Sequence, residues 1–168
     1  MSLIQSAVVS PCLWFDDQAE QAALHYVGIF PNAKIHRIAR YPNVGLEVHG
    51  RAAGSVMTVE FELEGLLFCA LNGGPGFKFN EAISLQILCD TQEQIDHYWH
   101  ALGEGGGGQS VQCGWLKDRY GVSWQVAPRL LGQLALDPDP ARAARAFGAM
   151  MKMVKIDIAG IERAVNAR

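Results

Sequence analysis

The sequence lacks any apolar run long enough to cross a membrane. Nowhere in its 168 residues does an apolar stretch approach the roughly 20 residues that a bilayer-spanning helix requires. The first five residues also lack the basic segment and the following apolar run of a secretory signal. We therefore expect neither a membrane partner nor an export signal.

The sequence also lacks a large excess of charge of either sign. Lys and Arg number 14 against 17 Asp and Glu, which leaves a net charge of −3 without a basic stripe. Nucleic-acid-binding surfaces are usually basic patches, so no nucleic-acid partner is expected. Apolar residues make up 49% of the chain, which is enough for a full core and excludes a disordered chain.

Cysteine occurs only four times, at Cys12, Cys69, Cys89 and Cys113. No two of these are close in the sequence, and three lie within strand-like apolar runs. This context indicates packed, reduced thiols rather than a disulfide framework. The cysteines therefore predict a cytoplasmic location.

What is present is a pattern that occurs twice. The first half predicts a strand at residues 8–15 and a helix that ends at Gly28. Asp17 is expected to cap this helix, with Glu20 completing a capping box. Three strands follow, at residues 34–41, 56–64 and 66–72.

The second half repeats this order, because Asp90 matches Asp17 at a shift of 73 residues (90 − 17). A strand at residues 83–89 leads to a helix that Asp90 or Thr91 caps, and the helix continues to Leu102. Strands at residues 111–117 and 122–127 follow, joined by a hairpin at 118–121. One strand of this half is not visible, and the glycine run 105–108 is expected to replace it.

Together the halves predict an α+β fold. Module one covers about residues 8–74 and module two about 82–128, within a domain at 1–135. A helical extension at 136–168 follows, with helices at 141–153 and 158–167. Ala143, Phe147 and the methionines at 150 and 151 form an apolar stripe, which predicts docking on the domain or on a partner subunit.

Two segments carry a resemblance to a known family: residues 72–80, Asn-Gly-Gly-Pro-Gly-Phe-Lys-Phe-Asn, and residues 113–125, Cys-Gly-Trp-Leu-Lys-Asp-Arg-Tyr-Gly-Val-Ser-Trp-Gln. With these segments the chain resembles the PhnB-like family of the glyoxalase/bleomycin resistance/dioxygenase (vicinal oxygen chelate) class. The resemblance implies paired βαβββ modules whose sheets curve around a cavity, and a homodimer. It also implies a label common in this family, 3-demethylubiquinone-9 3-methyltransferase.

Enzymes of this class hold a divalent ion with His, Glu or Gln on the inner sheet faces. The position that the resemblance assigns to a histidine falls near Ser84, and the position for a glutamate holds Gln125. In the first module, the strand that corresponds to the glutamate-bearing strand offers Ala70 or Asn72 at this position. Hard divalent ions need anionic or imidazole ligands, so we expect no metal and no cofactor. The methyltransferase activity is not expected either, since no strand, Gly-rich loop and helix followed by an acid suits S-adenosylmethionine.

Strand alternation indicates which side chains face the cavity. It places Ser84, Gln86 and Gln125 there as polar anchors of a ligand site. Four aromatic residues are further candidates for an apolar ligand cup, although core packing explains large aromatics equally well: Trp14, Phe79, Trp115 and Trp124. Trp124 and Gln125 are neighbours on one strand, so only one of the two should face the cavity.

Glu60 and Glu62 lie on the polar side of the strand with the clearest alternation of apolar and polar residues. That side either faces solvent or lines the cavity, in which case one of the two is a general-base candidate. Of the five histidines, only His36 is placed to face the cavity. The glycines at 73 and 74 form either an anion-binding nest or a linker, and the run 105–108 either a lid or slack.

The residues therefore predict a protein that binds an unidentified small molecule without metal. The alternative is an enzyme of the vicinal oxygen chelate class, either metal-dependent or an acid–base lyase, isomerase or transferase.

Overall fold

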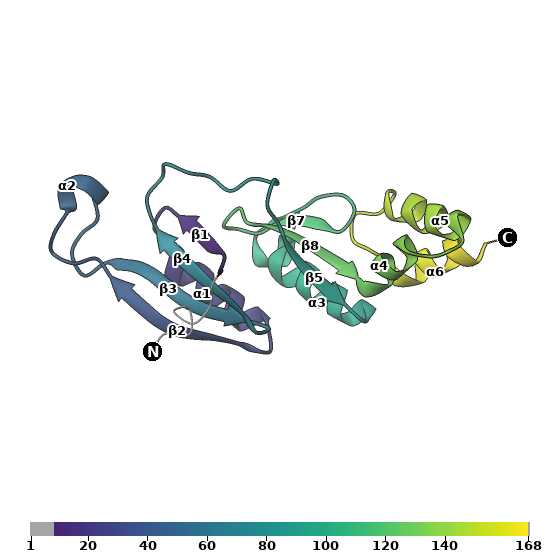
Figure 1. The fold of residues 1–168 in the computed structure, drawn as a ribbon, viewed down its shortest axis with the longest axis horizontal. Helices are drawn as coiled ribbons and strands as arrows, with labels where there is room; N and C mark the ends of the chain where they lie inside the picture. Colours follow the sequence, from purple (N-terminus) through teal and green to yellow (C-terminus); the bar gives the residue numbers. More distant parts are fainter. Residues whose placement is uncertain (1–8, 168) are drawn as a thin grey trace. The chain divides into compact units, whose positions relative to one another are not determined.

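The computed structural model describes residues 9–167 and divides the chain into two compact units, Met1–Phe79 and Asn80–Arg168 (Figure 1). The division falls between the two predicted modules. The predicted boundary between residues 135 and 136 stays a prediction. The predicted start of the first strand at residue 8 and the expectation about an export signal lie outside the described residues.

The first unit is a four-stranded sheet with one long helix against it. Its strands lie in the order β1-β4-β3-β2; β1 is parallel to β4, and the other neighbours are antiparallel. Glu64 and Gly65 join β3 to β4 with φ angles of 48° and 83°, as a two-residue hairpin turn requires. The elements are β1 (Cys12–Phe15), α1 (Ala19–Ile29), β2 (Ala33–Arg40), α2 (Leu46–His49), β3 (Val56–Leu63) and β4 (Leu66–Asn72).

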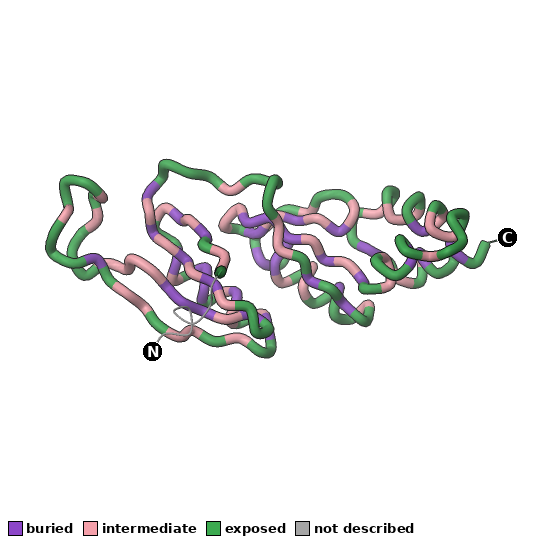
Figure 2. The backbone as a smooth tube through the Cα atoms, in the orientation of Figure 1, coloured by how far each residue is buried: buried purple, intermediate pink, exposed green. Residues whose placement is uncertain are grey.

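Helix α1 covers one face of this sheet, and the core of the unit lies between them (Figures 1 and 2). Phe61 stacks on Phe68 at 5.2 Å between ring centroids, and Tyr26 of α1 stacks on Phe61 at 6.2 Å. The alanines of α1 are fully buried, which lets the helix approach the sheet closely. We call the opposite face, which carries Cys12, Trp14, Glu60, Glu62 and Cys69, the first open face.

The predicted start of this helix is wrong. Gln18 rather than Asp17 occupies the cap position, and its side chain makes no capping hydrogen bond. The Ala19 N–H instead donates to Asn72 Oδ1 at 2.8 Å, so the end of β4 supplies the cap. The helix also continues to Ile29, one residue beyond the predicted end at Gly28.

The second unit repeats the same topology with a sheet order of β5-β8-β7-β6. Helix α3 lies 73 residues after α1 at both ends (92 − 19 and 102 − 29). The elements are β5 (Leu85–Cys89), α3 (Gln92–Leu102), a 3-10 turn η1 (Glu104–Gly106), β6 (Gln109–Ser110), β7 (Trp115–Lys117) and β8 (Ser123–Pro128). The α+β fold of paired βαβββ modules is therefore confirmed.

Helix α3 starts as predicted, with Thr91 and Gln94 forming a reciprocal capping box. The strand that the sequence did not reveal is the two-residue β6. The glycine run before it is not slack, because a Cβ at Gly108 would overlap the carbonyl oxygens of Leu102 and Lys117. Arg119 also donates to the Gly106 carbonyl. Glycine is required where this loop passes between backbone segments.

Three helices end the chain: α4 (Arg129–Ala135), which the sequence did not predict, α5 (Pro140–Met150) and α6 (Ile158–Asn166). Asp139 caps α5 and accepts from the Ala141 N–H at 2.9 Å. Backbone hydrogen bonds of 2.8 Å, from Cys113 to Met153 and from Gly114 to Val154, tie this region to the second sheet. Two residues of the predicted apolar stripe do not pack on this unit, since Phe147 is 60% exposed and Met151 47%, whereas Ala143 and Met150 are half-buried.

Candidate functional site

The second sheet has one face covered by α3 and one that α3 leaves open (Figures 1 and 2). Alternate residues of β5 and β8 are buried on the covered side, among them Ile87, Cys89, Trp124 and Val126. Their neighbours form what we call the second open face: Gln86, Leu88, Trp115, Lys117, Gln125 and Ala127. This division confirms the predicted alternation of β5 and β8.

Three predicted polar residues meet on this face. Gln86 and Gln125 are register partners on the parallel strands β5 and β8, and the Gln86 Nε2 donates to Gln125 Oε1 at 3.2 Å. The Gln125 Nε2 in turn donates to Ser84 Oγ at 2.8 Å. Gln86 is exposed while Ser84 and Gln125 are half-buried. The register joins Gln86 to Gln125, and Ser84, which lies just before β5 rather than within the predicted strand 83–89, extends them through its hydrogen bond into one row.

The row leaves hydrogen-bonding capacity for a ligand. The Ser84 hydroxyl accepts from Gln125, and within residues 9–167 it donates no hydrogen bond. A hydroxyl has one proton to donate, and an amide oxygen can accept two hydrogen bonds. The row can therefore donate through Ser84 and accept through the side-chain carbonyl of Gln86.

An aromatic side chain lies beside this row. Trp115 of β7 is the register partner of Gln125 and is half-buried on the second open face. Leu88 and Ala127 are register partners farther along the same face, and Leu88 is 46% exposed. Lys117, also on β7, forms an ion pair with Glu81. The face thus combines an indole, aliphatic surface and neutral hydrogen-bonding groups.

Trp124 lies on the other side of the sheet. It is only 2% exposed, and its indole Nε1–H donates to Asp118 Oδ2 at 2.8 Å. The prediction that only one of Trp124 and Gln125 faces the open side is confirmed. Trp124 belongs to the core under α3, because the alternation that exposes Gln125 buries its neighbour.

The other two aromatic candidates, Trp14 and Phe79, pack in and against the segment that follows β4. The Trp14 indole donates to the Gly74 carbonyl at 2.9 Å and meets Phe77 edge to face at 4.9 Å. Phe79 lies 5.2 Å from the ring of the buried Phe15. A Cβ at Gly73 would overlap the Trp14 ring, which explains the glycine.

Of the two interpretations left open for the glycines at 73 and 74, the contacts favour the linker over the anion-binding nest. The Gly73 N–H donates to the Phe15 carbonyl at 3.0 Å, and the Gly74 N–H donates to the Asp16 carbonyl at 3.3 Å. A nest needs successive N–H groups that point at an anion, and these two are already used within the backbone. The linker interpretation therefore holds.

The two glutamates of β3 are held in ion pairs on the first open face. Glu60 is 7% exposed and pairs with Arg37, its register partner on β2. Glu62 Oε2 lies 3.0 Å from His36 Nε2 and 3.9 Å from Lys34 Nζ. The side of β3 that carries the two glutamates is therefore not plainly solvated, because carboxylates with this little exposure need partners.

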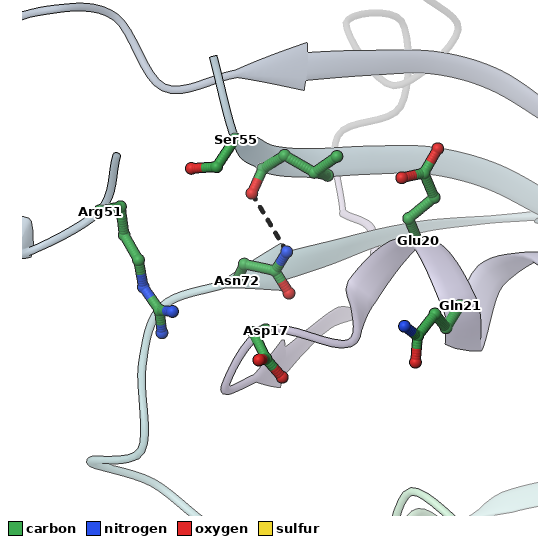
Figure 3. A pocket seen from close by; sticks show the side chains of 7 residues that line it. Asp17, Glu20, Gln21, Arg51, Ser55 and Asn72 are labelled. Atoms are coloured by element: carbon green, nitrogen blue, oxygen red, sulfur yellow. Dashed lines mark hydrogen bonds between the residues drawn. The ribbon is translucent and has the colours of Figure 1, made fainter. Parts of the chain in front are cut away.

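A small pocket of about 180 Å³ lies at the start of α1 (Figure 3). Asp17 and Glu20 line it together with Arg51, which also donates to Asp16 Oδ1 at 2.8 Å. Asn72 reaches its floor, and the Asn72 Nδ2 donates to the Val56 carbonyl at 3.1 Å. Sequence reasoning missed this pocket because α2 and the following loop, which bring Arg51 to α1, gave no pattern.

The residues of the second open face do not fit a hard divalent ion. Ser84, Gln86 and Gln125 are neutral, and their side chains bond to one another. Over residues 9–167 the structure holds no group of three or more His, Cys, Asp or Glu side chains arranged for a metal. Anionic or imidazole ligands offset the dehydration cost of such an ion, and this row provides none.

Within residues 9–167 no helix is both long enough and apolar enough to span a membrane.

The repeated βαβββ topology defines the class: a glyoxalase-like protein of the vicinal oxygen chelate superfamily. The family described as 3-demethylubiquinone-9 3-methyltransferase matches residues 7–127. A PhnB protein from Bacillus cereus that carries the same methyltransferase description is 30% identical, with a TM-score of 0.63. That alignment covers 73% of this chain and 99% of the other. The chain therefore belongs to this PhnB-like family.

Protein PA1353 from Pseudomonas aeruginosa is 17% identical and superposes with a TM-score of 0.56 over 71% of this chain and 96% of its own. The likeness supports the fold. No curated protein matches the sequence.

Proposed function

We propose that the protein binds a small molecule on the second open face. The observation that carries this proposal is the hydrogen-bonded row of Ser84, Gln125 and Gln86 beside Trp115. Ligand sites typically combine apolar surface with a few fixed polar groups that orient the ligand. Here the sheet register fixes Gln86 and Gln125, a hydrogen bond from Gln125 holds Ser84, and neighbouring strands provide the apolar surface.

The chemistry of the face favours a neutral ligand with a flat apolar part. Such a molecule would stack on the Trp115 indole and extend over Leu88 and Ala127. A carbonyl or hydroxyl oxygen would accept from Ser84, and a donor on the ligand would meet Gln86. Lys117 is paired with Glu81, so a net charge on the ligand is not required.

We propose further that binding needs neither a divalent ion nor S-adenosylmethionine. Neutral side chains, Ser84 and Gln125, occupy the positions that the family resemblance assigns to metal ligands. The Gly-rich segments at residues 73–76 and 105–108 do not form the turn between a strand and a helix that a nucleotide-type cofactor uses. The methyltransferase description of the family is therefore not carried over to this chain.

A second candidate function is acid–base catalysis at the first open face. The observation that favours it is the contact of 3.0 Å between His36 and Glu62, with side-chain exposures of 15% and 23%. A partly buried carboxylate–imidazole pair can hold and move a proton. The ion pair of Glu60 with Arg37 lies beside it, between register partners of the same two strands, β3 and β2. This candidate needs substrate access to that face.

The test is whether the protein retains a copurified small molecule through Gln125. Native mass spectrometry of wild type, Gln125→Leu and the matched control Gln133→Leu would measure the retained fraction. Gln133 is exposed on α4 and outside the row. We expect Gln125→Leu to fold normally and to lose affinity about 10- to 100-fold, because it removes the hydrogen bonds that hold Ser84 and Gln86 in place, worth about 1–3 kcal/mol. Equal retention by all three proteins would overturn the proposal.

A further inference from the structure

Two of the four cysteines are neighbours on the first open face, although 57 residues separate them (69 − 12). Cys12 of β1 and Cys69 of β4 are register partners on parallel strands. Register partners project to the same side of a sheet, and the buried Leu13 and Ala70 occupy the other side. Cys12 is exposed and Cys69 is half-buried. Cys89 and Cys113 belong to the second unit.

The two thiols differ in their electrostatic surroundings. A hydrogen bond from Cys69 lowers the pKa of Cys12 to about 7, against the opposing effect of partial burial. The same hydrogen bond raises the pKa of Cys69, and burial and the charges of Cys12 and Glu60 add to the rise. Glu60 is the register partner of Cys69, and its other neighbour is Arg37. The hydrogen bond therefore favours the thiolate at the accessible Cys12 and the thiol at Cys69.

We propose that Cys12 and Cys69 form a reversible dithiol–disulfide site that responds to hydroperoxides. Cys12 attacks the peroxide as a thiolate, so the O–O bond breaks, an alcohol or water leaves, and Cys12 becomes a sulfenic acid. Oxidation removes the Cys12 thiolate that raised the pKa of Cys69, so Cys69 can lose its proton to the departing hydroxyl as its sulfur attacks the Cys12 sulfur; water leaves and the S–S bond closes. Each disulfide consumes one peroxide and both thiol hydrogens. A thiol reductant reverses the step by exchange.

The register brings the two cysteines within bridging range. Neighbouring strands lie about 4.7–4.9 Å apart, and the Cα atoms of bridged cysteines usually lie about 4.4–6.8 Å apart. β1 can adjust to the bond because it is a four-residue strand at the edge of the sheet. Cys12 is exposed, and an accessible disulfide is readily reduced.

The site lies in the other unit from the second open face, so the two proposals stand independently. Closure would shift Trp14, two residues after Cys12 and bonded to Gly74. Oxidation should therefore change the Trp14 environment, which gives an optical readout besides mass.

The experiment treats the reduced full-length protein with one equivalent of hydrogen peroxide, followed by peptide mapping without reductant. We expect a single intramolecular bond between Cys12 and Cys69 that dithiothreitol removes. In Cys69→Ala the sulfenic acid has no partner, so dimedone should label Cys12. The matched control Cys113→Ala, a half-buried cysteine of the second unit, should behave as wild type.

A second measurement does not depend on disulfide closure. Alkylation of Cys12 by iodoacetamide should be half-maximal near pH 7 in wild type and move toward the ordinary thiol range, about 8.5, in Cys69→Ala. The proposal is overturned if the bond fails to form, if it joins two chains instead, or if Cys69→Ala leaves the alkylation midpoint unchanged.

Discussion

Asp118 accepts hydrogen bonds from three donors within the hairpin between β7 and β8. Its Oδ2 accepts from the Trp124 indole at 2.8 Å, and its Oδ1 accepts from the backbone N–H of Tyr120 and of Val122. The carboxylate is only 4% exposed. The turn residues in the sequence predicted the hairpin, but the same residue also fixes a core tryptophan. A local motif therefore anchors the helix-covered side of the sheet, whose opposite side carries the candidate ligand row.

The first prediction is that Asp118→Asn destabilises the protein. One side-chain oxygen becomes an NH₂ group that cannot accept from the donors it faces, so we expect a loss of about 1.5–3 kcal/mol in the free energy of unfolding. Urea titration followed by tryptophan fluorescence measures it. Asp17→Asn, at an exposed carboxylate, is the control and should change little. An unchanged midpoint in Asp118→Asn would contradict the assigned role.

At the scale of elements, the alternation of apolar and polar residues predicted the strands and their faces. It succeeded for β3, β5 and β8 because one face of each sheet is buried and the side-chain period is fixed. Thr91 was one of the two residues expected to cap α3, and its capping box with Gln94 lies within four residues of the chain. The contacts that the sequence did not reveal are distant in the chain: the Asn72 cap of α1 and the Cys12–Cys69 pair. Both depend on the parallel pairing of β1 with β4.

The second prediction tests this corrected helix cap. Asn72→Ala removes the acceptor for the Ala19 N–H and the donor to the Val56 carbonyl, so we expect a loss of about 1–2 kcal/mol in stability. Asp17→Ala, at the residue that the local sequence favours as the cap, should stay within about 0.5 kcal/mol of wild type. Thermal and urea unfolding of both variants would decide. A larger loss in Asp17→Ala than in Asn72→Ala would restore the local interpretation.

The third prediction concerns the segment after β4. Gly73→Ala places a methyl group into the Trp14 ring, so we expect about 1–3 kcal/mol of destabilisation and a shifted tryptophan emission. Gly76→Ala has open space around it and serves as the matched control. Equal stability of the two variants would show that the linker adapts without cost.

At the scale of the whole molecule, the two units share a topology but not a chemistry. The first open face carries paired charges and two thiols, and the second carries neutral amides beside an indole. Helix α3 starts and ends 73 residues after α1, whereas the buried residues of β5, Ile87 and Cys89, lie 74 residues after those of β1, Leu13 and Phe15. The connection from β1 to α1 is therefore one residue longer than the connection from β5 to α3. Internal comparison alone would have assigned the facing residues of β1 incorrectly.

The fourth prediction is that the purified protein contains no stoichiometric divalent ion. Ser84, Gln86 and Gln125 offer neutral donors, which do not offset the dehydration of a hard cation. Elemental analysis of protein prepared without chelator measures the content. A near-stoichiometric transition metal that Gln125→Leu removes would refute the prediction.

The last prediction is that the protein is a homodimer. Phe147 and Met151 lie one turn apart on and just after α5, and their exposures of 60% and 47% leave apolar surface uncovered. Burying such surface on a second copy is favourable at about 25 cal/mol per Å², and two-fold dimers are the commonest soluble oligomers. Light scattering at micromolar concentration should give twice the chain mass of 18.3 kDa. Phe147→Asp combined with Met151→Asp should shift the protein toward monomer, whereas Leu136→Asp, at a side chain 85% exposed outside this stripe, should not. A wild-type mass of one chain would refute the dimer, and a dimer that tolerates both aspartates would place its interface elsewhere.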